Sequence, residues 1–171
     1  MRHCITQMFP IRGYNDYSKR WQYMREKYNL IFPKDYRLFI DTYGSGSFNN
    51  FLWVMSPFSL NDNLNLLKKF NDLKRSFCTM KSILPDMLME EFYDGVKGLL
   101  PWGITDNGDE LYWNVQKEYS QIVVFSCRYS EKLEFDLTFG DFLDQIFSQK
   151  IMCSIFPEDF ILNENYYDSL E

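Results

Sequence analysis

Apolar positions in the first half of the chain recur mostly at the spacing of a helix. Residues 14–28 place large side chains three or four positions apart: Tyr14, Tyr17, Trp21, Met24 and Tyr28. A second stripe, between Pro33 and Gly44, comprises Tyr36, Phe39, Ile40 and Tyr43. A third, which Asn61 or Asp62 can cap, comprises Leu66, Leu67, Phe70, Leu73 and Phe77. The pattern predicts three amphipathic helices, and Pro85 is expected to begin a further helical piece that ends near Asp94.

Other segments show the pattern of β-strands. Residues 48–55 are aromatic and β-branched, and Pro57 stops this run. Asn107-Gly108 is the favoured pair for a type I′ turn, because both central residues need a positive φ; we expect a hairpin of residues 102–106 and 111–115. Residues 121–127 are hydrophobic on both faces and predict a central strand, whereas residues 132–137 alternate and predict one solvated face.

The chain continues with a helix and an acidic tail. Thr138 and Asp141 form an Asp-containing capping box, which precedes the inward-facing Phe139, Phe142, Ile146 and Phe147. The tail, residues 157–171, has five acidic and no basic side chains, and is expected to be an extra edge segment or a frayed end. No repeat or Gly/Ser linker divides the chain.

We therefore expect one domain over residues 1–171, with its core at about residues 14–150 and residues 157–171 as an acidic C-terminal extension. Helices segregate from meandering strands, so the fold class is α+β. The expected architecture is a mainly antiparallel sheet of about five or six strands, with helices packed on one face and at the ends.

Composition adds an aromatic excess and a charge asymmetry. Phe 16, Tyr 12 and Trp 4 fit a bulky core, with an aromatic recognition surface as the alternative. Residues 1–85 carry 13 basic and 6 acidic side chains, a net of +7, whereas residues 86–171 carry 5 and 18, a net of −13. An acidic C-terminal half repels nucleic acid and attracts a basic protein, although acidic faces that only keep the protein soluble explain it equally.

The cysteines are Cys4, Cys78, Cys127 and Cys153, and their spacing contains no CxxC pair. The sequence shows no secretory signal and no apolar run of the roughly 18 residues that a membrane span needs. We therefore expect a cytoplasmic protein without a disulfide framework, a zinc site or membrane contact.

Few residues are candidates for catalysis. His3 is the only histidine and lies near the start of the chain, which leaves little basis for a Cys–His or Ser–His pair. Gly44 and Gly46 lack the third glycine of a dinucleotide motif, and residues 106–110 place glycine at the wrong position for a calcium loop. We therefore predict no catalytic residue, no cofactor and no metal site.

Three segments of the chain form a set of motifs: Phe32-Pro33-Lys34-Asp35-Tyr36 with Phe39-Ile40 and Tyr43-Gly44-Ser45-Gly46, Leu100-Pro101-Trp102-Gly103 with Asn107-Gly108-Asp109 and Tyr112-Trp113, and Thr138-Phe139-Gly140-Asp141-Phe142-Leu143. In their order and spacing they resemble the SUKH superfamily, which includes the yeast cell-wall assembly regulator and many bacterial immunity proteins. Phe32 and Trp102 replace the family's usual Leu and Phe, and the insert between Leu60 and Leu100 is long. The resemblance implies a single α+β domain that binds another protein, in bacteria typically the toxin encoded beside it, and implies no enzymatic activity.

We therefore predict an immunity protein that caps a cognate basic toxin, such as a nuclease, as a monomer or weak homodimer without binding nucleic acid or membranes. Acidic groups in residues 86–110 are expected to mimic substrate phosphates, and exposed aromatics to anchor the complex. The candidate partner-binding residues are Asp86, Glu90, Glu91, Asp94, Trp102, Asp106, Asp109, Glu110 and Trp113. A solvated acidic helix face is the simpler explanation of residues 86–94. The alternative functions are a regulatory adaptor and, less favoured, a carboxylate-dependent hydrolase using Glu90 or Asp109.

Overall fold

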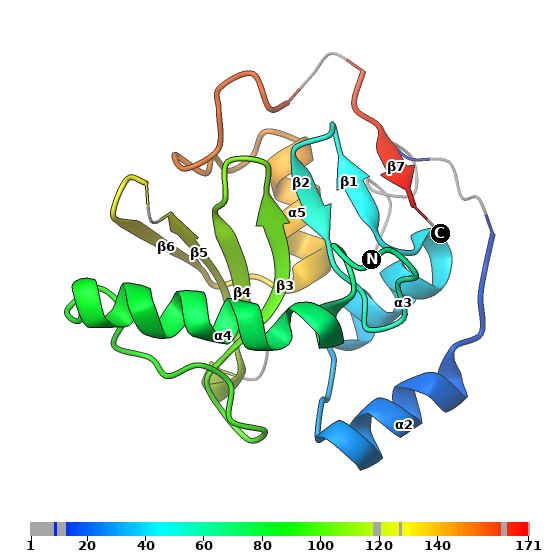
Figure 1. Ribbon diagram of the computed structural model, residues 1–171. Helices are drawn as coiled ribbons and strands as arrows, with labels where there is room; N and C mark the ends of the chain where they lie inside the picture. The colour runs from blue at the N-terminus through cyan, green and yellow to red at the C-terminus, as the bar shows by residue number, and fades with distance from the viewer. Residues whose placement is uncertain (1–8, 10–12, 118–120, 127, 162–163, 171) are drawn as a thin grey trace.

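A seven-stranded antiparallel sheet forms the centre of the computed structural model, which describes residues 9, 13–117, 121–126, 128–161 and 164–170. The strands are β1 (Gly46–Phe48), β2 (Leu52–Val54), β3 (Leu99–Thr105), β4 (Glu110–Asn114), β5 (Ile122–Ser126), β6 (Glu131–Phe135) and β7 (Tyr167–Ser169). Their order is β6-β5-β4-β3-β2-β1-β7, so the first six form a meander and the tail adds β7 beside β1 (Figure 1). The α+β class is confirmed, and the tail strand takes the sheet beyond the five or six strands expected.

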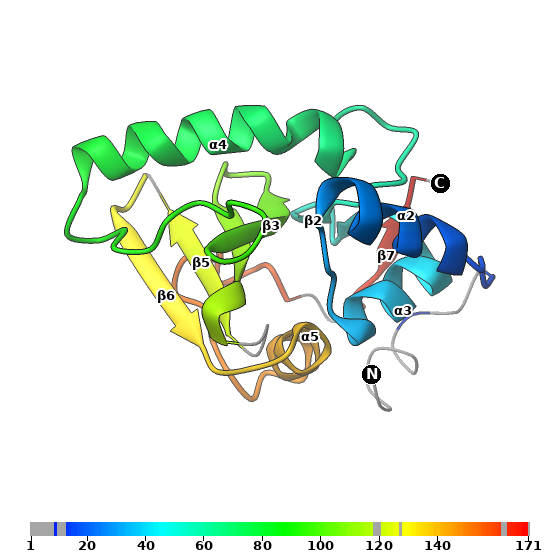
Figure 2. The same ribbon diagram turned by 90° about the horizontal axis from the view of Figure 1, so that it is seen from below.

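Helices cover both faces of this sheet. The helices are α2 (Ser18–Tyr28), α3 (Lys34–Tyr43), α4 (Leu66–Ile83) and α5 (Phe139–Phe147). Figure 2 shows α4 on one side of the sheet and α3 and α5 on the other. Successive residues of β4 show the two interfaces: Tyr112 contacts Phe77 of α4, and Trp113 contacts Tyr36 of α3 and Phe139 of α5. The expectation of helices on one face is therefore wrong, because both faces of the central strands are apolar and each needs a cover.

Aromatic rings fill the core between the sheet and α5. The ring centroids of Trp102 and Phe139 lie 5.0 Å apart, and those of Trp102 and Trp113 lie 6.1 Å apart. The first pair is edge-to-face, with an interplanar angle of 85°, and the second is tilted at 32°. Edge-to-face contacts stabilise a core beyond the burial of area alone. The core also includes Phe9 and Tyr167, which lie outside the expected core range. Much of the aromatic excess is therefore core material.

The predicted strands β5 and β6 occur where the hydrophobic pattern placed them. β5 is buried at all five positions and lies between β4 and β6, which confirms an internal strand. β6 is an edge strand, but its predicted polar face is only partly solvated: Glu134 is exposed, whereas the side chain of Lys132 is only 13% exposed. β3 begins at Leu99, three residues before the start expected for the hairpin.

Helices α3 and α5 also follow the sequence prediction. The hydroxyl of Thr138 accepts a hydrogen bond from the backbone N–H of Asp141 and donates one to its carboxylate, which confirms the capping box. α3 directly follows Pro33 and ends before Gly44, and all four predicted inward residues are buried.

Helix α2 is shorter than its stripe suggested. It begins at Ser18, so Tyr14 lies outside it and is 65% exposed. Trp21 and Met24 are buried, whereas Tyr28 is exposed at the end of the helix. Tyr17, directly before the helix, is partly buried and its ring lies 5.1 Å from that of Phe58. The stripe is therefore confirmed at Tyr17, Trp21 and Met24, and wrong at its two ends, Tyr14 and Tyr28.

Helix α4 begins three to four residues later than predicted. Asn65, rather than Asn61 or Asp62, is the capping residue, and its side-chain oxygen accepts a hydrogen bond from the N–H of Lys68 at 3.1 Å. Although α4 has 18 residues, it is amphipathic. No helix in the described parts of the chain combines the length and apolar character needed to cross a membrane.

The run 48–55 forms two strands instead of one. Asn49 and Asn50 both have a positive φ, 51° and 52°, and the N–H of Phe51 donates to the carbonyl of Phe48 at 2.9 Å. Asparagine tolerates this conformation better than most residues, so the Asn-Asn pair reverses the chain between β1 and β2.

The hairpin between β3 and β4 is confirmed, but its turn is not type I′. Of its loop residues, only Gly108 has a positive φ, 83°. The N–H of Gly108 donates to the carbonyl of Thr105 at 3.0 Å, and the N–H of Thr105 donates to the carbonyl of Asp109 at 2.9 Å. This is the pattern of a three-residue loop with glycine in the left-handed position.

Candidate functional site

Residues 84–98, here called the connecting loop, join α4 to β3 and run back along α4 (Figure 1). The helical piece predicted from Pro85 to Asp94 is wrong, because these residues form turns and bends. The loop buries Leu88, Phe92 and Tyr93 against the core. Side chains of neighbouring elements also hold its backbone in place.

The end of the loop turns into β3 at a tight backbone crossing. The N–H of Leu99 donates to the carbonyl of Glu91 at 2.8 Å, and the N–H of Tyr93 donates to the carbonyl of Leu99 at 3.0 Å. Gly98 has a φ of 107°, and a Cβ there would lie 2.6 Å from the Glu91 carbonyl oxygen. The crossing therefore requires glycine.

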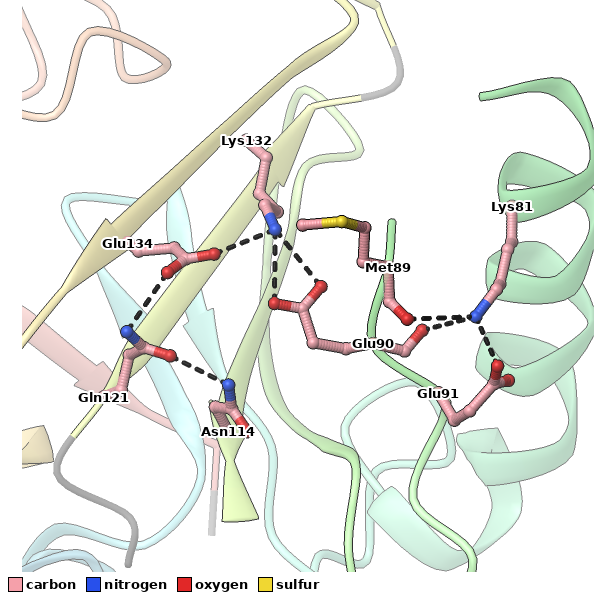
Figure 3. Close-up of polar contacts among 8 residues, drawn as sticks. All are labelled: Lys81, Met89, Glu90, Glu91, Asn114, Gln121, Lys132 and Glu134. Carbon is pink, nitrogen blue, oxygen red and sulfur yellow. Dashed lines mark hydrogen bonds and ion pairs between the residues drawn. The ribbon is translucent and has the colours of Figure 1, made fainter. Parts of the chain in front are cut away.

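Lys81 ties the loop to α4. Its Nζ donates to the carbonyl of Glu90 at 2.7 Å and lies 2.5 Å from Oε1 of Glu91 (Figure 3). It also lies 3.5 Å from the carbonyl of Met89. Lys81 thus provides a donor for backbone carbonyls that would accept N–H groups of the same segment if the segment were a helix.

Lys132 of β6 forms the second tie, from the sheet. Its Nζ lies 3.1 Å from Oε2 of Glu90 and 2.8 Å from Oε1 of Glu134, and Gln121 donates to the other oxygen of Glu134 at 3.1 Å (Figure 3). The side chains of Lys132 and Glu90 are only 13% and 16% exposed. Burial lowers the pKa of Lys132, but its hydrogen bonds to Glu134 and Glu90 outweigh this and raise it. Glu90 is therefore an internal ion-pair partner.

The third tie fixes the tip of the loop to the end of α2. The hydroxyl of Tyr93 donates to the carbonyl of Asn29 at 2.7 Å, and the amide of Asn29 donates to the carbonyl of Gly95. Within the tip, the carboxylate of Asp94 accepts from the N–H of Val96 at 2.8 Å. Three separate elements thus define the shape of the connecting loop.

Four of the nine candidate residues lie inside the protein. Trp102 and Trp113 are 0% exposed and belong to the core, so they cannot supply the exposed aromatic anchor expected from the sequence. Asp109 is buried and accepts a hydrogen bond from the hydroxyl of Thr105 at 2.7 Å. Glu110 is buried on the α4 face, and burial raises its pKa.

The other five candidates do not form one acidic surface. Asp86, Glu91 and Asp94 are exposed on the connecting loop, and Glu90 is largely covered. Asp106 is exposed at the opposite end of β3. The carboxylates of residues 86–110 are thus not brought together as a row of phosphate mimics.

The loop presents apolar side chains that sequence reasoning did not single out. Met89 is 77% exposed and Val96 is 75% exposed, and Ile83 at the end of α4 is 67% exposed. A search for helical or strand periodicity could not identify Met89 and Val96, because the connecting loop is neither a helix nor a strand. Binding residues are disproportionately found on loops that a rigid scaffold positions, so Met89 and Val96 are candidates for contact with a partner.

Within the described residues, no group of three or more His, Cys, Asp or Glu side chains is placed to hold a metal ion. Cys78 is exposed and Cys153 is buried, and both are free thiols. Burial raises the pKa of Cys153 to about 12, which keeps this thiol protonated. His3, Cys4 and Cys127 lie outside the described residues.

The sheet, its two helical layers and the structured loop define a single-domain α+β protein of the kind predicted from the three sequence segments. A protein-family model described as SUKH_6, SMI1-KNR4 cell-wall, matches residues 18–143, and the chain belongs to this family. The match runs from α2 into α5 and includes the connecting loop. No curated protein and no solved structure matches the chain.

Proposed function

We propose that this protein is a cytoplasmic immunity protein that neutralises a cognate toxin by binding it, without catalysing a reaction. Membership of the SMI1-KNR4 family supports a protein of this kind at the level of the family. The observation that carries the proposal is the connecting loop, which is fixed by Lys81, Lys132 and Asn29 while Met89 and Val96 remain in solvent.

A loop with this construction is suited to capping a partner. Binding costs free energy when it must order a flexible segment, and the ties at both ends of the connecting loop remove much of that cost in advance. Burial of Met89 and Val96 against a toxin would stabilise the complex by roughly 25 cal/mol per Å² of apolar area. The loop would therefore supply the apolar centre of an interface.

The proposed partner is a basic protein. Asp86 and Asp94 are exposed on the same loop and, among the described residues, take part in no ion pair. Such carboxylates at the rim of an apolar patch mainly raise the association rate of a basic protein and confer specificity. This role needs no mimicry of a phosphate backbone.

Co-expression with the toxin encoded beside this gene tests the proposal in a growth assay. We expect the wild type to restore growth and the double variant Met89→Asp/Val96→Asp to fail, with toxin affinity lowered at least about tenfold. Leu60→Asp is the matched control, because Leu60 is 90% exposed on another loop. Failure of the wild type to protect, or full protection by the double variant, would contradict the proposal.

A regulatory adaptor is the second candidate function, because the matching family is described by a cell-wall term. Affinity purification of the tagged protein from its native cells separates the two functions. A toxin as the specific partner supports immunity, and a signalling or cell-wall assembly protein supports the adaptor.

A further inference from the structure

A pocket of about 410 Å³ lies at the end of α5, in the part of the chain that follows the family match. We call it the extension pocket. Its apolar lining comprises Ile146, Ile151, Met152, Phe156, Phe160 and Ile161. A volume of this size accommodates one or two large side chains of another protein.

The wall of the extension pocket is a structured segment. The N–H of Phe156 donates to the carbonyl of Cys153 at 2.9 Å, and the N–H of Phe160 donates to that of Pro157 at 3.0 Å. The rings of Phe156 and Phe160 pack 5.3 Å apart, and Phe160 also packs 5.6 Å from Phe147 of α5. The apolar lining is therefore held in place before any partner arrives.

The pocket lining includes one carboxylate and one exposed apolar side chain. Glu158 lines the pocket and Asp159 follows it, both exposed and, in the part of the chain that the structure describes, without an ion pair. Residues 141–161 contain four acidic side chains and one basic side chain, Lys150. Met152 stands at the mouth with 83% of its surface exposed. Apolar walls below carboxylates favour a ligand that is both apolar and positively charged.

We infer that the extension pocket binds a segment of the basic toxin in which a Lys or Arg side chain adjoins an apolar one, an inference that rests on the proposed function. The apolar side chain and the aliphatic stem of the cation fill the pocket, and the charged head meets Glu158 and Asp159. The pocket is lined by residues 146–161, which follow the part of the chain that the family model matches. The pocket thereby determines which toxin this protein recognises.

The test uses a catalytically inactive form of the toxin encoded beside the gene, with affinity measured by calorimetry at several salt concentrations. We expect Glu158→Lys and Met152→Asp each to weaken binding at least about tenfold, and Glu158→Lys also to reduce the salt dependence. Glu26→Lys is the control, because it makes the same charge change at an exposed position on α2. Its affinity should stay within about twofold of the wild type. Thermal unfolding of each variant verifies that it is folded.

Three results would overturn the inference, and they are distinguishable. If the wild type binds the toxin and both pocket variants bind equally well, the pocket is not the docking site and the proposed function stands. If the wild type does not bind the toxin, the proposed function fails and the pocket loses its occupant with it. If sedimentation of the protein alone shows a dimer that Met152→Asp dissociates, the occupant is a second copy of this chain.

Discussion

The connecting loop and the extension pocket are two irregular surfaces that the protein holds in shape by different forces. Lys81 and the Lys132–Glu90 pair fix the loop through charged hydrogen bonds. Phe156 and Phe160 fix the pocket wall through ring packing. Both surfaces expose a methionine together with carboxylates: Met89 with Asp86 and Asp94 on the loop, and Met152 with Glu158 at the pocket. Loss of charge should therefore loosen the loop, whereas loss of apolar volume should loosen the extension.

Phe160→Ala is expected to have the largest effect, because it removes the ring that joins the extension to the core. Phe160 is 4% exposed, and its ring lies 5.0 Å from that of Phe51 and 5.6 Å from that of Phe147. Truncation of a buried phenylalanine leaves a cavity and costs about 3 kcal/mol or more. Urea unfolding measures the loss of stability.

Hydrogen exchange locates this loss. Protection should fall first in residues 151–161 and remain high in the connecting loop. Equal loss of protection in both regions would show that the two surfaces do not unfold independently.

Lys132→Met is expected to cost about 2 kcal/mol, because it leaves the carboxylates of Glu90 and Glu134 without their shared cation. Hydrogen exchange should show faster exchange in residues 86–94 and unchanged protection in residues 151–161. Lys150→Met is the matched control, since Lys150 is exposed and has no ion pair among the described residues. If the connecting loop stays protected in Lys132→Met, the burial of Leu88 and Phe92 is sufficient to hold the loop in place without this ion pair.

The difference between the two surfaces also explains what the sequence could predict. α5 was predictable because its signals are local: a capping box at Thr138 and apolar residues at helical spacing. β5 was predictable because a short run buried on both faces has a recognisable pattern. The hairpin at Asn107-Gly108 was predictable. The type of its turn was not, because a glycine at this position fits both a two-residue type I′ turn and a three-residue loop.

The two surfaces themselves depend on contacts between distant residues. Lys132 of β6 and Glu90 of the connecting loop meet only when the loop packs against the formed sheet, so no spacing in the sequence indicates that Glu90 is an ion-pair partner. Trp102 and Trp113 were expected at the surface, but both point from neighbouring strands towards α5. The Asn-Asn pair at residues 49 and 50 was the one local signal that could have been read, since asparagine favours turns. Pockets leave no such signal.

Glu110→Gln tests whether the α4 face contains a buried charge that affects stability. Burial raises the pKa of Glu110, while hydrogen bonds from Tyr112 and Ser76 partly offset this. Because the folded pKa exceeds the unfolded one, the folded state binds this proton more tightly. The free energy of unfolding therefore falls as the pH rises through the folded pKa, and stays lower above it.

Glutamine has no proton to lose, so Glu110→Gln should be more stable than the wild type at neutral pH by on the order of 1 kcal/mol, and the advantage should shrink in acid. Urea unfolding between about pH 4 and 8 measures the difference. Asp106→Asn is the control, because Asp106 is exposed in the nearby turn. Parallel curves for the wild type and Glu110→Gln would exclude the buried carboxyl as the cause.

The smallest change in stability, and the most direct comparison, comes from two exposed methionines. Met89 is 77% exposed on the connecting loop, and Met152 is 83% exposed at the mouth of the extension pocket. Met89→Ser and Met152→Ser should each change stability by less than about 0.5 kcal/mol, because neither side chain contributes to the core. Toxin affinity should fall several-fold in both, and the losses should add in the double variant if the two surfaces contact separate parts of the toxin. A loss confined to Met89→Ser would assign recognition to the matched scaffold alone, because residues beyond 143 would then add nothing to the interface.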